Sequence, residues 1–81
     1  MHYVTIRRCP AGSKIGLHAA ELAGEIRDDS ALNVRVADGA PGEFGIEMDG
    51  IWIAGMEGDE LKPIDDLAAE IRGAALTTTY A

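Results

Sequence analysis

The sequence predicts an α/β fold of order β-α-β-β-β-α, in which four strands form a mixed sheet and two helices pack on it. The prediction depends on two segments with a helical apolar period and on short runs rich in β-branched residues. It also depends on Asp49-Gly50, a strong hairpin signal between two of those runs. At 81 residues the chain forms one domain, 1–81.

The first strand and the first helix follow one another directly. The run from about Tyr3 to Arg8 is β-branched and aromatic, which predicts a strand. Because both of its faces carry bulk, we expect a central strand that is covered on both sides. A helix is predicted from about Ser13 to Asp28, with one apolar stripe made by Ile15, Ala19, Leu22 and Ile26.

The remaining elements are three strands and a second helix. Residues 32–37 alternate apolar and polar side chains, and residues 44–48 and 51–54 flank the Asp49-Gly50 turn, so all three runs are predicted strands. Pro63 suits the first position of a helix, whose apolar stripe contains Leu67 and Ile71. Residues 75–81 are expected to form a frayed tail because threonines weaken a helix.

Composition excludes several classes of function. The net charge of −7 argues against nucleic-acid binding and against docking on an anionic membrane. A single cysteine, Cys9, cannot form an internal disulfide, and we expect a cytoplasmic protein. Cys9, His2 and His18 do not have the spacing of a zinc site. We therefore expect neither a metal nor a cofactor.

Cys9 is the strongest candidate for chemistry because it lies where the first strand ends and the first helix begins. The partial positive charge of a helix start, together with Arg7, Arg8 and Lys14, favours a thiolate. Such settings lower the cysteine pKa from about 8.5 to between about 3.5 and 7.5. One hypothesis is thus an exposed, nucleophilic thiolate. The alternative is a small apolar residue that closes the strand and is inert.

The order of parts resembles the thioredoxin-like, selenoprotein W-related redox family over roughly residues 3–72. That family has a strand, a Cys-x-x-Cys or Cys-x-x-selenocysteine turn and a helix, and here the turn reads Cys9-Pro10-Ala11-Gly12. A Gly-x-Phe strand, an Asp-Gly turn and a proline before the last helix follow in the family. This chain has them in residues 42–46, 49–50 and 62–67.

The resemblance implies thiol-disulfide exchange or thiol redox sensing, but Gly12 occupies the position of the second cysteine or selenocysteine. A monothiol is then implied, with Cys9 as the nucleophile and glutathione or a partner-protein thiol as the resolving group. Pro10, Gly12, Ser13 and Lys14 form the turn that would stabilise the thiolate. Thioredoxins also place a cis-proline opposite the reactive cysteine, and Pro41 is the candidate by position.

The alternative function is a non-catalytic protein–protein interaction module or complex subunit that has lost the dithiol site. Its candidate surface contains Trp52 and Met48 beside the hairpin, whose last strand is also a candidate for strand addition. Trp52 is expected either to pack under a helix or to be exposed in that surface. His18 is expected to be partly packed, with a role as base for Cys9 as the less favoured alternative.

Overall fold

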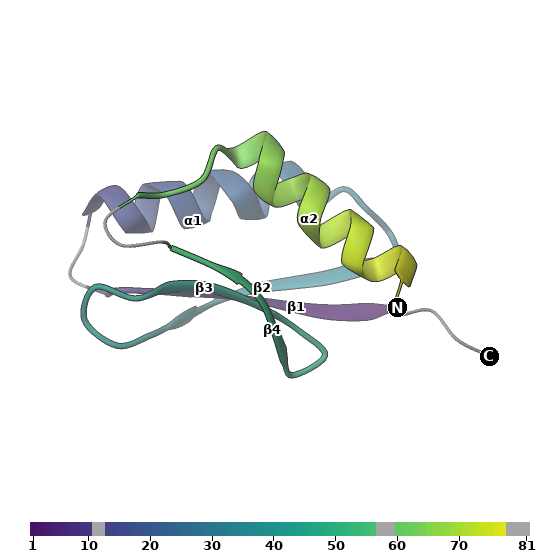
Figure 1. Cartoon of the computed structure of the whole chain (residues 1–81), viewed down its shortest axis with the longest axis horizontal. Helices are drawn as coiled ribbons and strands as arrows, with labels where there is room; N and C mark the ends of the chain where they lie inside the picture. The colour runs from purple at the N-terminus through teal and green to yellow at the C-terminus, as the bar shows by residue number, and fades with distance from the viewer. Residues whose placement is uncertain (11–12, 57–59, 78–81) are drawn as a thin grey trace.

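The computed structural model of the chain describes residues 1–10, 13–56 and 60–77 and confirms the predicted order of elements. The sheet has the strand order β2-β1-β3-β4 (Figure 1). The six elements are β1 (His2–Arg8), α1 (Ser13–Ile26), β2 (Leu32–Asp38), β3 (Phe44–Met48), β4 (Ile51–Gly55) and α2 (Ile64–Thr77).

The sheet is mixed, as predicted, and β1 is central in it. β1 pairs in parallel with β2 and antiparallel with β3, so that Ile6 lies between Val36 and Ile46. The β3–β4 hairpin contains an irregularity next to Ile46, and beyond it Glu47 pairs with Trp52. This register places Trp52 on the opposite face of the sheet from Ile46.

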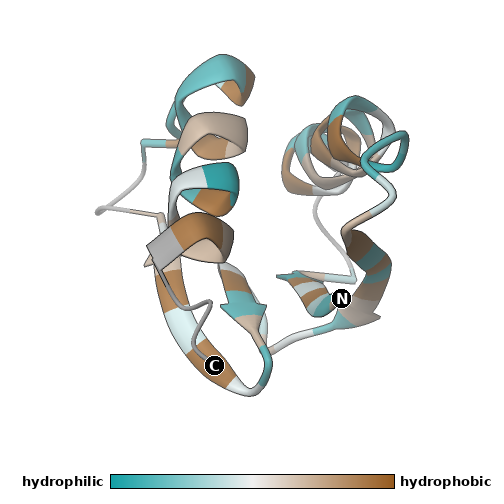
Figure 2. Cartoon of the chain, turned by 90° about the vertical axis from the view of Figure 1, so that its right-hand side faces the viewer, coloured by the Kyte–Doolittle hydropathy of each residue, from teal (hydrophilic) through white to brown (hydrophobic). Residues whose placement is uncertain are grey.

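Both helices lie on the same face of the sheet, so the molecule has two layers (Figures 1 and 2). The core between the layers contains Val4 and Ile6 of β1, Leu22 of α1 and Leu67 of α2, all fully buried. The other face of β1 presents Tyr3, which is 61% exposed. The expectation that the first strand is covered on both sides is therefore wrong, because α2 packs beside α1 rather than on the opposite face.

Three boundaries differ from the sequence prediction. α1 ends at Ile26, two residues early. α2 begins at Ile64, one residue after Pro63, which was the predicted first position. The carbonyl of Pro63 accepts the first helical hydrogen bond of α2, from the N–H of Leu67 at 3.1 Å. α2 continues to Thr77, so Ala75 is helical and the expected start of fraying there is wrong. Residues 78–81 lie outside the part of the chain that the structure describes.

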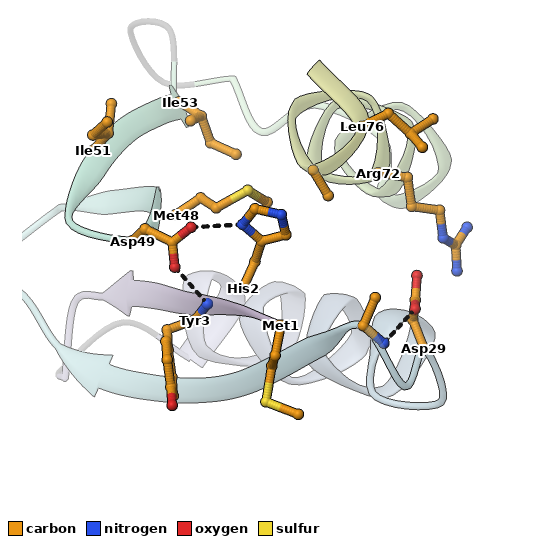
Figure 3. Close-up of a pocket in the computed structure, with 12 residues that line it drawn as sticks. Met1, His2, Tyr3, Asp29, Met48, Asp49, Ile51, Ile53, Arg72 and Leu76 are labelled. Atoms are coloured by element: carbon orange, nitrogen blue, oxygen red, sulfur yellow. Dashed lines mark hydrogen bonds and ion pairs between the residues drawn. The ribbon is translucent and has the colours of Figure 1, made fainter. Parts of the chain in front are cut away.

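The hairpin turn has the geometry that Asp-Gly predicts. Asp49 and Gly50 have positive φ angles of 53° and 86°, as a two-residue turn of the mirror-image type requires. The turn directs the Asp49 carboxylate back toward β1. There it accepts hydrogen bonds from the Tyr3 N–H at 2.8 Å and from Nδ1 of His2 at 2.6 Å (Figure 3).

Asp49→Asn should remove part of the acid sensitivity of folding. The Tyr3 N–H, and secondarily His2, hold the pKa of Asp49 below its ordinary value of 3.8. The stability that this lowered pKa supplies is complete above 3.8 and is lost as the pH falls through the folded-state pKa. Asparagine tolerates the positive φ. Denaturant unfolding at a series of pH values should give the variant a flatter acid limb, and parallel limbs would contradict the assignment.

Candidate functional site

Cys9 follows the last residue of β1 and precedes α1 by a short connection. Its side chain is buried, with 7% of the residue exposed. Its N–H donates to the carbonyl of Glu43 at 2.8 Å, which ties it to the segment that enters β3. The sequence predicted that the Cys9 side chain is exposed, and this part of the prediction is wrong. The local pattern did not show this tie because Glu43 is distant in sequence.

The two arginines before Cys9 are engaged with carboxylates. Arg8 Nη1 lies 2.9 Å from Oδ1 of Asp38. Arg7 lies 3.6 Å from an oxygen of Glu43 and 3.5 Å from one of Glu47. These carboxylates were not singled out by the sequence, and they offset the positive charge that was expected to favour a thiolate.

The rest of the predicted turn is only partly described. Pro10 is exposed, Ser13 is the first residue of α1, and Lys14 is exposed on its first turn. Gly12 lies outside the described residues, so the structure does not test its place beside Cys9. The first turn of α1 has no acidic residue that would oppose an anion at the helix start.

Pro41 does not have the predicted special geometry. No cis peptide bond occurs in the described ranges, so Pro41 is trans, and the residue is exposed. Pro41 belongs to the turn before Glu43, in which the N–H of Ala40 donates to Oε1 of Glu43 at 2.7 Å. The candidate cis-proline is thus wrong, although its turn is the one whose Glu43 contacts Cys9.

His18 is partly packed, as the favoured reading of the sequence predicted. Its Nε2 lies 2.7 Å from the carbonyl oxygen of Lys62 and therefore donates to it. Its ring meets Phe44 edge-on, with the centroids 5.6 Å apart. His18 thus joins α1 to the segment before α2. These contacts give it a structural role and assign it no role as a base for Cys9.

Two solved structures share this arrangement. A protein of Bordetella parapertussis matches with a TM-score of 0.72 at 18% identity, over 90% of this chain and 96% of that one. A selenoprotein W-related protein of Vibrio cholerae matches with a TM-score of 0.64 at 14% identity, over 91% and 96%. The chain therefore shares its fold with these two proteins. The thioredoxin-like α/β architecture that the sequence predicted is confirmed. No family model and no curated protein matches the sequence.

The two candidate residues of a partner surface have different positions in this fold. Met48 is buried, at 3% exposure, in the core between the sheet and the helices, so its place in a surface is wrong. Trp52 is 51% exposed on the face of the sheet without helices. Its packing under a helix is therefore also wrong, whereas its exposure leaves it available to a partner.

The described residues hold no group of three or more His, Cys, Asp or Glu side chains that could hold a metal ion. No helix in the same ranges is long and apolar enough to span a membrane.

Proposed function

We propose that this chain is a single-cysteine thiol-redox protein in which Cys9 exchanges with glutathione disulfide or with a partner-protein disulfide. The observation that carries the proposal is the place of the sole cysteine. Cys9 lies between the end of β1 and the start of α1, in a fold shared with a selenoprotein W-related protein. The resemblance of the Cys9–Gly12 turn to that family's redox turn supports the same chemistry.

The proposed reaction has two balanced steps. The Cys9 thiolate attacks the glutathione sulfur of a mixed disulfide between glutathione and a partner protein, which forms a Cys9–glutathione disulfide and releases the partner's thiolate. A glutathione thiolate then attacks the glutathione sulfur on Cys9. This step releases the Cys9 thiolate and forms glutathione disulfide, so the net reaction reduces the partner's mixed disulfide and oxidises one glutathione. No second cysteine of this chain is needed, which agrees with the sequence.

Burial sets the expected kinetics. Because Cys9 is 7% exposed, an attacking group reaches its sulfur only when the surrounding segment opens. We therefore expect exchange that is slower than for an exposed thiolate of the same pKa. The contact between the Cys9 N–H and the Glu43 carbonyl is one of the contacts that such opening disturbs.

The test is the pH dependence of Cys9 alkylation in the folded protein, followed by mass spectrometry after treatment with glutathione disulfide. The chain has one cysteine, so any adduct belongs to Cys9. We expect a half-maximal alkylation rate below about pH 8.5, the ordinary cysteine pKa, and a single glutathione adduct. Cys9→Ser is the blank. Reaction only after denaturation would instead make Cys9 a structural residue and overturn the proposal.

A non-catalytic interaction module is the second candidate. It is favoured by one contrast: Cys9 is 7% exposed, whereas Trp52 is 51% exposed on the open face of the sheet. Under this alternative, Cys9→Ser leaves partner binding unchanged. The surface that such a partner would use is the strand that carries Trp52.

A further inference from the structure

β4 is an edge strand that carries no charged residue and no proline, and its one protective feature is the irregularity at Ile53 in its pairing with β3. In the part of the chain that the structure describes, the strand that pairs with it is β3. Residues 51–55 include no charged residue and no proline. Ile51 is 62% exposed and Trp52 is 51% exposed. Natural proteins commonly place charges, prolines or bulges on exposed edges, because an open edge offers backbone groups to any other strand.

The opposite edge of the same sheet differs in this respect. β2 carries Asn33, Arg35 and Asp38, and all three are exposed. Arg35 and Asp38 are charged, and charged side chains on an edge oppose the addition of another strand. The lack of charged side chains is therefore a specific feature of the β4 edge, and it does not follow from the fold as such.

An apolar cleft borders β4 on the helix side. It has a volume of about 1040 Å³ and lies between β4 and the C-terminal part of α2 (Figure 3). Ile51, Ile53 and Leu76 line it, and Leu76 is 79% exposed. A strand added to β4 would direct every second side chain toward this cleft, because successive side chains in a strand point to opposite faces.

Trp52 provides the contact on the other face. Its indole lies across Gly45 and Gly55. A Cβ added at Gly45 would lie 1.8 Å from the ring, and one added at Gly55 would lie 2.8 Å from it. The ring thus has a defined place on the sheet and half of its surface exposed. The remaining side chains of an added strand would lie beside this ring on the open face.

The negative charge of the chain indicates which kind of segment β4 would bind. The described residues 44–56 and 60–61, which contain the hairpin, include three carboxylates and no lysine, arginine or histidine, and Glu47 also lies 3.5 Å from Nη1 of Arg7. The whole chain has a net charge of −7, so a second copy would bring the same negative charge to the interface. A segment with lysine or arginine is attracted instead, and a cation over the face of Trp52 adds to that attraction.

We propose that β4 binds an extended segment of a partner protein as a fifth strand of the sheet. In that segment apolar side chains alternate with basic ones. The apolar side chains occupy the cleft beside Ile51 and Ile53, and the basic ones lie over Trp52 on the open face. Backbone pairing supplies affinity, and the alternation supplies specificity. This binding is independent of Cys9, which lies at the other end of β1 from the cleft.

The experiment titrates the isotope-labelled protein with a short, end-blocked peptide in which valine alternates with lysine. We expect saturable shifts, and protection from hydrogen exchange, at the amides of residues 51–53. Ile51→Lys should weaken binding by about tenfold or more, since it places a charge on the edge and removes an apolar contact. Asn33→Lys is the matched control, because it adds the same charge to the β2 edge and should change binding by less than about twofold.

Three further peptides separate the parts of the proposal. Two carry N-methyl groups, one on every valine and the other on every lysine, so that each lacks the backbone donors of one edge. One of these two should not bind if pairing with β4 is required. A peptide with glutamate in place of lysine should bind far more weakly. Undiminished binding of both N-methylated peptides or of the glutamate peptide, or shifts centred on β2, would overturn the proposal. So would a dimer of the protein alone that Ile51→Lys abolishes in sedimentation experiments, because the occupant would then be a second copy. None of these peptides contains a cysteine, so the results are separate from those on Cys9.

Discussion

Ile6→Ala should lower the free energy of unfolding by about 2–5 kcal/mol, the range for deletion of a fully buried isoleucine side chain. Ile6 is 0% exposed in the central strand and lies between Val36 and Ile46 in the sheet. Domains have about 0.05–0.15 kcal/mol of stability per residue, so the loss is a large share of the total for a chain of 81 residues. Urea unfolding measures it as a lower midpoint with an unchanged slope.

Ile51→Ala is the matched control for this prediction. It removes the same atoms from a residue that is 62% exposed on β4. We expect a change within about 0.5 kcal/mol, as for other exposed positions. If both variants lost the same stability, β1 would not be the centre of the core.

Gly45→Ala should destabilise the protein through Trp52. An ideal Cβ at Gly45 would lie 1.8 Å from Cη2 of the indole, so the ring must move. Trp52 is half-exposed and can swing into solvent, and the cost is then set by the packing that the ring loses across Gly45 and Gly55. We expect a loss of about 1–3 kcal/mol, the usual range for overpacking. The emission of the sole tryptophan should also shift to the red.

A double-mutant cycle isolates this contact. In a Trp52→Ala background the clash is absent, so Gly45→Ala should cost little, and the two substitutions should be strongly non-additive. Gly24→Ala is the control for the loss of a glycine. Gly24 lies inside α1, and apart from its chain neighbours and the nearby backbone of α1 no atom lies within 4 Å of the added Cβ, so alanine there should stabilise by about 0.5–1 kcal/mol. Additive effects of Gly45→Ala and Trp52→Ala would contradict the assigned contact.

The pattern of neighbouring residue types was sufficient to predict the helices, the strands and the hairpin turn. The apolar stripe of α1 is buried at Ala19, Leu22 and Ile26, as the helical period requires. Asp49 and Gly50 both take positive φ, as their turn requires. Hydrogen bonds within a helix or across a hairpin join residues that are near in sequence, so a short window of residue types is enough to indicate them.

The candidate site was predicted less completely, for a physical reason. The position of Cys9 between β1 and α1 follows from local pattern. Its backbone contact, by contrast, is with Glu43, more than thirty residues away, and its burial is a property of the folded chain. The carboxylates that engage Arg7 and Arg8 come from the same distant part of the chain. Nothing near Cys9 in the sequence signals these contacts.

The sequence by itself determined which segments are strands and helices, where the hairpin turns, and that a lone cysteine closes the first strand. Tertiary structure decided which face of each strand is covered. Alternation along a strand defines two faces but does not say which one meets a helix, because that depends on where elements distant in sequence pack. Both helices lie on one face, and for this reason Met48 is buried in the core, whereas Trp52 lies exposed on the open face.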